Sequence, residues 1–414
     1  MSGTHKYVFF NFPAYGHVNP TLAIVAELIA RDEQVVYYLP ERFRQTIEAT
    51  GAIFHPYQDT LFTRQQEQFA PRVRPANGDQ RIAMLPVLMI QESLQVIPQL
   101  LESVRAEQAD CLVYDSMFLW GRMVARTLHL PAIALRPSYA AAEQSNVFGS
   151  VAQRFQLSSE RTAILKNILV QLGTKSGVPR FDMRSILVHT EPLILVFLPR
   201  AFQPGGETFD ERYLFVGPSF QSHRDDSLDF PREQLGTQPL LYISLGTVFN
   251  DQADFYRTCF TAFGDTTWQV LLSVGPTLDR ATRTGMPGNF IVASRVPQLE
   301  VLSRAKLYVS HGGMNSVMES LAYGVPLVVI PQISEQAVTA RRVQELGLGL
   351  ALDREVVTVE RLREAVTQVA GDPSFSARAQ AMQQAICEAG GYRRATEAIM
   401  QFARDTRPGV SEPV

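Results

Sequence analysis

Short apolar runs alternate with segments of helical spacing through the first 140 residues of the chain. The apolar runs have the length and the aromatic or β-branched content of buried strands. They are KYVFFNF (6–12), QVVYYL (34–39), CLVYDS (111–116) and PAIALRP (131–137). The segments between them predict helices over 19–33, 42–51, 85–108 and 118–129. This alternation predicts a parallel sheet covered by helices on both faces.

The same alternation restarts near residue 239, after two stretches of different character. Residues 141–190 are more polar and predict an inserted helical region, whereas residues 199–238 are rich in charge, Pro and Gly. Further strands are predicted at LLYISLG, WQVLLSVG, NFIVASRV, KLYVS and PLVVIPQ, with helices near 251–264 and 301–305. We therefore predict an α/β fold of two Rossmann-like parallel-sheet domains facing one another across a deep cleft, which is the expected ligand site.

The changes of pattern also set the predicted domain boundaries. An N-terminal domain is expected over 1–215, an interdomain linker over 216–238 and a C-terminal domain over 239–395. Residues 396–414 are expected to form a helix and tail that pack back towards the N-terminal domain. The chain contains no short repeat and no low-complexity segment.

Composition and charge narrow the class of protein. The chain is 46% hydrophobic and 19% charged, with a net charge of −3, so it has no basic field to attract nucleic acid or an anionic membrane. Cys111, Cys259 and Cys387 lie far apart without metal-ligand spacing, and we expect buried thiols in a reducing compartment. No apolar run is long enough to span a bilayer, and the first apolar run resembles a strand more than a signal peptide. We expect a cytoplasmic protein; nothing in the sequence specifies its oligomeric state.

A glycine-rich turn follows the predicted strand KLYVS, in the stretch SHGGMNSVMES (310–320). At the carboxyl ends of parallel strands, helix N-termini direct free N–H groups and a positive dipole at ligands. Gly312 and Gly313 allow close backbone approach, while His311, Asn315 and Ser316 supply donors for a phosphate. The alternative is a plain capped turn with no ligand. Neither a Walker A pattern nor G-x-G-x-x-G after a strand is present, which disfavours kinases, NTPases and dehydrogenases.

Glu319 adds an acid to this predicted phosphate site. It lies three residues after Ser316, one turn along the same helical face. Because a carboxylate would repel phosphate, we expect Glu319 to bind a pair of hydroxyl groups such as those of a ribose. The turn and the acid together predict a site for a nucleoside diphosphate.

A second candidate site lies in the first half of the chain. His17 stands in PAYGHVNP between the first strand and the first helix, and Asp115 ends the strand CLVYD. Both are expected at the carboxyl rim of one sheet, where a neutral imidazole oriented by a carboxylate can remove a proton from a hydroxyl group. The N-terminus of a helix starting near Val18 would favour the neutral ring. A lone histidine in a turn is otherwise more often a cap or a surface residue.

Four motifs in the second half of the chain together resemble a known family signature. RVPQLEVL (295–302), SHGGMNSVMES (310–320) and VIPQISEQ (329–336), with ISLGT (243–247), resemble the donor-binding signature of the UDP-glycosyltransferase family of the GT-B fold. The chain is most similar to the bacterial macrolide and natural-product branch, and the resemblance includes AYGHVNP and CLVYDS.

The resemblance implies a role for each matching position. Arg295 and Val296 would frame the uracil, Gln298 and Glu319 would bind the ribose, and Glu335 and Gln336 would contact the sugar. The residues implied at the diphosphate are His311, Gly313, Asn315, Ser316, Ser244 and Thr247. Two positions depart from the family pattern, since many members have Trp in place of Arg295 and Asp in place of Glu335; Arg can stack on a base, but its shape differs from that of Trp.

The resemblance also implies the chemistry. His17 and Asp115 would be the catalytic pair, and one general base with backside attack predicts inversion at the anomeric carbon. No Asp-x-Asp pair of the kind that holds a divalent cation on donor phosphates is present, so we expect no metal and no cofactor, with a UDP-sugar as co-substrate. The helix dipole, His311 and main-chain donors would stabilise the leaving diphosphate.

Large apolar side chains between residues 60 and 150 are the candidates for an acceptor pocket beside His17. More than half of them are expected to be plain core, but Met and aromatic linings suit varied hydrophobic ligands. The candidate lining residues are Phe62, Met84, Met89, Phe118, Tyr139 and Phe148. They favour a bulky lipophilic acceptor such as a macrolide, polyketide or flavonoid.

The sequence thus supports one main hypothesis and three alternatives. The main hypothesis is an inverting, metal-independent hexosyltransferase that moves glucose from UDP-glucose, the donor favoured by Gln336, to a hydroxyl group of a lipophilic small molecule. A natural-product enzyme that uses a dTDP-deoxysugar is the first alternative. A nucleotide-sugar epimerase and a non-catalytic nucleotide-sugar binder are the others, and neither would transfer a sugar to an acceptor.

Overall fold

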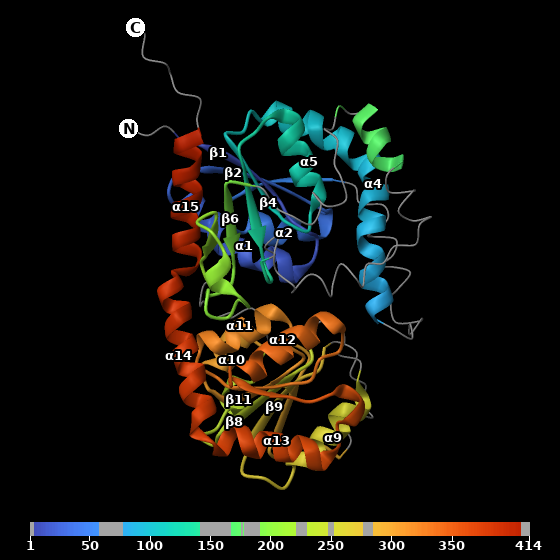
Figure 1. Cartoon of the computed structure of the whole chain (residues 1–414). Helices are drawn as coiled ribbons and strands as arrows, with labels where there is room; N and C mark the ends of the chain where they lie inside the picture. Colours follow the sequence, from blue (N-terminus) through green and yellow to red (C-terminus); the bar gives the residue numbers. More distant parts are fainter. Residues whose placement is uncertain are drawn as a thin grey trace. The chain divides into compact units, whose positions relative to one another are not determined.

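The computed structural model describes residues 4–57, 78–140, 167–174, 177, 191–220, 230–246, 252–275 and 285–406. The chain divides into two compact units, each built on one sheet (Figure 1). The first unit comprises residues 1–220 and 389–414, and the second comprises 221–388. In the described residues, no helix combines the length and apolar character that crossing a membrane would need.

The first unit is built on a seven-stranded parallel sheet in the order β3-β2-β1-β4-β5-β6-β7. Its strands are β1 Lys6–Phe10, β2 Gln34–Leu39, β3 Ile53–Pro56, β4 Cys111–Asp115, β5 Ala132–Arg136, β6 Leu193–Val196 and β7 Tyr213–Phe215. Its helices are α1 Tyr15–Ala30, α2 Arg44–Glu48, α4 Gly78–Glu107, α5 Leu119–Leu128 and α15 Gly391–Thr406, with 3-10 turns at Glu41–Phe43 and Gly206–Thr208.

Four of these strands match the apolar runs of the sequence, and three short strands were not predicted. The unpredicted strands are β3, β6 and β7, each only three or four residues long, so their apolar runs are too short to show a period. Helix α1 begins at Tyr15, four residues before the predicted start at residue 19. His17 therefore lies in the first turn of α1 and not in the preceding loop.

One face of this sheet packs against α1 and α15. Alternate residues of β1, β2 and β4, among them Phe9, Tyr37 and Val113, join one core cluster with α1 and α15. Helix α15 contributes Ala395, Ile399 and Ala403 to that cluster at successive intervals of four residues. The helical tail thus packs on α1 within the first unit.

The second unit is built on a six-stranded parallel sheet in the order β10-β9-β8-β11-β12-β13. Its strands are β8 Leu240–Ser244, β9 Gln269–Ser273, β10 Phe290–Ala293, β11 Ala305–Ser310, β12 Leu327–Val329 and β13 Gly349–Ala351. Its helices are α9 Ala253–Phe263, α10 Gln298–Leu302, α11 Met314–Ala322, α12 Ser334–Glu345 and α13 Val359–Gly371, with 3-10 turns at Arg232–Gln234 and Arg354–Val356. Helix α14 Pro373–Ala389 follows and ends where the chain returns to the first unit.

The two faces of the second sheet differ in polarity. Leu241, Ile243, Leu307 and Val309 belong to an apolar core cluster that includes residues of α9 and α13. The alternate residues at the carboxyl ends of the same two strands are tyrosines and serines, Tyr242 and Ser244 on β8 and Tyr308 and Ser310 on β11, and they face the opposite side. Figure 1 shows α10, α11 and α12 on one side of this sheet and α9 and α13 on the other. The polar face is therefore the one beneath the candidate nucleotide site.

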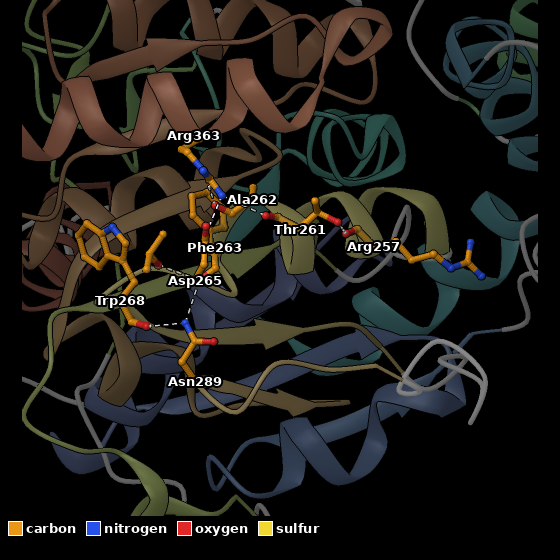
Figure 2. Close-up of polar contacts among 9 residues, drawn as sticks. Arg257, Thr261, Ala262, Phe263, Asp265, Trp268, Asn289 and Arg363 are labelled. Carbon is orange, nitrogen blue, oxygen red and sulfur yellow. Dashed lines mark hydrogen bonds and ion pairs between the residues drawn. The ribbon is translucent and has the colours of Figure 1, made fainter.

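The C-terminal end of α9 is held by side chains from two other segments (Figure 2). The guanidinium group of Arg363, on α13, donates to the backbone carbonyl of Ala262 at 2.8 Å and to the carboxylate of Asp265 at 2.8 Å. The amide of Asn289 donates to the carbonyls of Phe263 and Trp268, at 2.9 and 2.8 Å. These bonds satisfy carbonyl groups that a helix end leaves without partners, and they fix the apolar side of the unit.

Cys111 and Cys259 are buried as predicted, and burial raises the pKa of both thiols well above the ordinary range. The prediction was wrong for Cys387, which is exposed near the C-terminal end of α14. Its polar neighbours Gln384 and Glu388 show that this stretch of the helix faces water.

Candidate functional site

His17 and Asp115 meet at the carboxyl ends of β1 and β4, which are neighbours in the first sheet. Nδ1 of His17 lies 2.5 Å from Oδ2 of Asp115. Because an ionised carboxylate only accepts hydrogen bonds, the proton of the neutral ring sits on Nδ1, and Nε2 keeps its lone pair. The His17 side chain is 20% exposed and that of Asp115 is 1% exposed. The pair can therefore remove a proton at Nε2 while the buried carboxylate stabilises the resulting imidazolium.

Both partners of this pair are fixed by further contacts. The second carboxylate oxygen of Asp115, Oδ1, accepts from the backbone N–H of Met117 at 2.8 Å. The amide of Asn11 donates to the carbonyl of His17 at 2.7 Å, and the ring of Phe12 lies 4.9 Å from the imidazole ring. Asn11 and Phe12 follow β1 directly, so the end of that strand sets the position of the His17 ring.

A buried cation lies next to Asp115 in the sheet. Arg136 ends β5, and its Nη1 donates to Oγ of Ser116 at 3.0 Å while Nη2 donates to the carbonyl of Tyr139 at 2.7 Å. Burial lowers the pKa of Arg136, and the negative charge of Asp115 acts in the opposite direction. The charge of Asp115 thus helps to keep the buried guanidinium group of Arg136 protonated.

The turn before α11 brings backbone donors and an imidazole together. Gly312 has φ of +83°, and a Cβ added to it would lie 2.6 Å from Cγ1 of Val329, so only glycine fits there. Gly313 caps α11, and the first residues of that helix direct N–H groups out of its N-terminus. This geometry is suited to an anion such as a diphosphate.

The ring of His311 is enclosed by two glycines in this turn. A Cβ added to Gly246 would lie 2.6 Å from Cε1 of His311, and a Cβ added to Gly313 would lie 2.5 Å from its Nε2. Burial lowers the pKa of His311 to about 4, with a hydrogen bond to the carbonyl of Ser244 acting in the opposite direction. His311 is therefore neutral at pH 7 and can act only as a neutral hydrogen-bonding group, not as a cation.

Gln298 and Glu319 form a second polar pair in this unit. Nε2 of Gln298, on α10, donates to Oε2 of Glu319, on α11, at 2.5 Å, and lies 3.4 Å from Oγ of Ser316. Oε1 of Gln298 accepts from the hydroxyl group of Tyr242, on β8, at 2.9 Å. Burial raises the pKa of Glu319 to about 7, with the Gln298 hydrogen bond lowering it. The two side chains that the family resemblance assigns to a ribose are thus adjacent.

The structure places the other predicted donor residues at the same edge of the second unit. Ser244 ends β8 and is buried, whereas Arg295 is exposed and Val296 partly buried in the loop before α10. Gln336 is buried in the first turn of α12, where its Oε1 accepts from the backbone N–H of Gln332 at 2.8 Å, and Glu335 is exposed beside it. Thr247 lies outside the described residues.

The predicted acceptor residues are described only in part. Phe62 and Phe148 lie outside the described residues, and Met84 and Met89 lie in the part of α4 whose side chains are not described. Phe118 is buried and packs against the rings of Phe10, Tyr57 and Trp120. Tyr139 is buried and stacks on Phe202, with centroids 6.1 Å apart. Both are packed as core aromatic residues, and their contact with an acceptor stays a prediction.

Four positions that the sequence analysis did not single out belong to these sites. Tyr242 and Tyr308 precede Ser244 and Ser310 by two residues, so strand alternation alone would have placed all four on one face. Gly246 follows β8 and has φ of +77°. Arg136 ends the strand next to that of Asp115. A charged residue at the end of an otherwise apolar strand is the sequence feature that could have identified it.

Comparison with known proteins identifies the fold and the chemistry that these sites serve. Residues 265–389 match the family model described as the C-terminal domain of erythromycin biosynthesis protein CIII-like proteins. The chain is 40% identical over 402 residues to the NDP-glycosyltransferase YjiC of Bacillus licheniformis, covering 96% of this chain and 98% of that protein. It is 34% identical to demethyllactenocin mycarosyltransferase of Streptomyces fradiae, covering 94% and 85%.

The solved structures agree with this relationship. The crystal structure of CalG4, the calicheamicin glycosyltransferase, superposes with a TM-score of 0.83 at 31% identity, over 99% of this chain and all of that one. Two parallel-sheet units with this likeness confirm the predicted GT-B fold. The chain therefore belongs to the GT-B UDP-glycosyltransferase family, in its macrolide and natural-product branch, and is a glycosyltransferase.

Proposed function

We propose that this glycosyltransferase transfers glucose from UDP-glucose to a hydroxyl group of a lipophilic small molecule, with inversion at the anomeric carbon and without a metal ion. The observation that carries the proposal is the 2.5 Å contact between His17 and Asp115. This contact leaves Nε2 of His17 as the base. A single general base corresponds to a single displacement, which inverts the configuration.

In the proposed reaction, Nε2 of His17 takes the proton of the acceptor hydroxyl group as its oxygen attacks C1 of the sugar. The new C1–O bond forms while the bond from C1 to the β-phosphate oxygen breaks, and UDP leaves with that electron pair. Asp115 stabilises the imidazolium ion.

The donor is assigned to the polar face and rim of the second sheet. Gln298 and Glu319 would bind the ribose hydroxyls, and Arg295 with the backbone of Val296 would frame the base. The N-terminus of α11, together with His311, Ser316 and Ser244, would hold the diphosphate, and the α11 dipole would stabilise the charge that develops on it. Gln336 and Glu335 would contact the sugar.

A dTDP-deoxysugar is the second candidate donor. One relative, at 34% identity, is a mycarosyltransferase, so members this similar transfer sugars other than glucose. Arg295 and Glu335, the two departures from the family pattern, lie at the positions assigned to the base and the sugar. These two positions are therefore the first at which we expect a difference in donor specificity to arise.

A donor panel tests the proposal. UDP-glucose, UDP-galactose, UDP-N-acetylglucosamine and dTDP-linked deoxysugars are each incubated with the protein and a mixed set of macrolide, polyketide and flavonoid acceptors. Mass spectrometry is expected to show a hexose adduct with UDP-glucose, with turnover unchanged by EDTA, and NMR of the product is expected to show a β-glucoside. Transfer only from dTDP-sugars would replace the donor assignment; an α-glucoside or loss of turnover with EDTA would contradict the mechanism.

A further inference from the structure

Two buried tyrosines lie side by side beneath the Gln298–Glu319 pair. Tyr242 on β8 and Tyr308 on β11 are register partners, and their rings stack with centroids 4.6 Å apart and an interplanar angle of 12°. Both rings are at most 1% exposed. The two tyrosines lie on the same face of the sheet and are buried to nearly the same degree. They differ chiefly in the hydrogen bonding of their hydroxyl groups.

The hydroxyl group of Tyr242 reaches the amide of Gln298, and that of Tyr308 does not. Tyr242 donates to Oε1 of Gln298 at 2.9 Å. The hydroxyl group of Tyr308 has no hydrogen-bond partner among the described residues. Burial keeps both phenols protonated, because it raises the pKa of Tyr308 to about 12 and that of Tyr242 well above its ordinary value. Tyr242 is therefore a donor to Gln298.

The Glu319 carboxylate sets which way the Gln298 amide points, and the contact with Tyr242 holds the amide in that position. An amide side chain can turn by 180° and exchange its oxygen and nitrogen, so its orientation follows from its partners. With Oε1 accepting from Tyr242, Nε2 faces Oε2 of Glu319 at 2.5 Å. The reversed amide would bring its oxygen against the oxygens of Glu319. The phenol between the sheet and α10 therefore helps to hold an N–H donor and a carboxylate acceptor side by side on α10 and α11.

We propose that Tyr242 is a positioning residue for nucleotide recognition, which holds the Gln298 amide so that Nε2 and the Glu319 carboxylate together engage the ribose hydroxyl groups of the donor. This inference rests on the proposed assignment of the nucleotide to the second unit. A ribose hydroxyl group can donate to Glu319 and accept from Nε2 at once, which matches the donor and acceptor that the two side chains offer. Tyr242 itself touches no ligand in this scheme.

The proposal predicts an effect that depends on the sugar of the nucleotide. Tyr242→Phe removes the hydroxyl group and keeps the ring and its stack on Tyr308, so the fold is preserved while the amide is released. Tyr308→Phe is the matched control, because it removes a phenol with the same burial from the neighbouring strand. Isothermal titration calorimetry compares UDP with 2′,3′-dideoxy-UDP, which has the same base and diphosphate and lacks both ribose hydroxyl groups.

Tyr242→Phe is expected to weaken UDP binding about 5- to 10-fold, the value of roughly one hydrogen bond. Its affinity for 2′,3′-dideoxy-UDP should stay within two-fold of wild type, and kcat at saturating UDP-glucose should change little while KM rises. Tyr308→Phe should alter neither affinity by more than two-fold. In a Gln298→Ala background, Tyr242→Phe should have no further effect on UDP binding.

Two results would overturn the inference about Tyr242 and leave the proposed function intact. Equal UDP affinity in wild type and Tyr242→Phe would show that the contact does not matter, and an equal loss for both nucleotides would show a general structural role. If the wild-type protein bound neither nucleotide while remaining folded, the donor assignment, and with it the proposed function, would fail as well.

Discussion

Nδ1 of His17 and Oδ2 of Asp115 lie 2.5 Å apart although 98 residues separate them in sequence. The pairing of β1 with β4 creates this contact, because both strands end at the same edge of the sheet. His17 follows β1 in the first turn of α1, and Asp115 is the last residue of β4. Strand order thus brings the proposed base and its orienting acid together.

Asp115→Asn is expected to reduce kcat/KM for glucosyl transfer by about 100-fold or more, because the amide can donate to Nδ1 and so favours the wrong tautomer of His17. UDP affinity should be unchanged. Asp110→Asn is the matched control: Asp110 precedes the other end of β4, where its Oδ2 accepts from the backbone N–H of Lys6 at 2.8 Å. Steady-state kinetics and thermal melts of both variants make the comparison. Equal losses of activity in the two would indicate a structural effect.

UDP affinity is expected to rise with pH between 6 and 8 because of Glu319. Its pKa of about 7 means that the side chain is largely protonated at pH 6 and ionised at pH 8. Since the carboxylate is the acceptor assigned to the ribose, the association constant should rise about ten-fold over this range. Calorimetry of wild type and Glu319→Gln isolates the contribution of Glu319 to the pH dependence of UDP affinity, because titration of the diphosphate affects both proteins equally. A pH profile that Glu319→Gln leaves unchanged would remove Glu319 from the ribose site.

The free energy of unfolding should show the opposite dependence on pH. The folded-state pKa of Glu319, about 7, is above its ordinary value of 4.5, so the folded protein holds this proton more tightly than the unfolded chain. The stabilising contribution is full below pH 4.5 and is lost as the pH rises through 7. Relative to wild type, Glu319→Gln should therefore gain about 2 kcal/mol between pH 5 and pH 8. Urea titrations at the two pH values measure the free energy of unfolding of both proteins. An equal change in wild type and Glu319→Gln would contradict the prediction.

A methyl group at Gly313 should disturb the His311 ring. The added Cβ would lie 2.5 Å from Nε2, and Gly246 encloses the ring on another side, so the imidazole cannot simply swing away. Gly313→Ala is expected to weaken UDP binding at least about ten-fold, because the diphosphate site loses its backbone approach and its imidazole together. Gly371→Ala, at the end of α13, is the control, since no atom of the described residues lies within 4 Å of its added Cβ. Unchanged affinity in Gly313→Ala would place the diphosphate elsewhere.

The sequence predicted the architecture and the positions of the candidate sites because both depend on local patterns. Apolar runs identified the central strands, and the rule that ligands lie at carboxyl ends placed His17, Asp115 and the 310–320 stretch correctly at the strand ends. Helix α1 was predicted to start too late because proline is favoured at the first helical position, whereas Pro20 lies inside the helix. Strands β3, β6 and β7 are too short for a periodic signal.

Contacts that depend on packing between elements were not predictable. The Gln298–Glu319 hydrogen bond joins α10 to α11, and the approach of those two helices is not encoded in either segment alone. The same is true of the bond from Tyr242 to Gln298, which spans 56 residues. The exposure of Cys387 was missed because a single small residue on a helix carries little information about which face is buried.

The rate of glucosyl transfer by His17→Ala tests the central claim most directly. Without an imidazole at this position the proposed general base is missing, so kcat/KM with UDP-glucose and a hydroxylated acceptor is expected to fall by about 100-fold to 10,000-fold, with UDP affinity unchanged. Transfer by His17→Ala at the wild-type rate would contradict the assignment of His17 as the base.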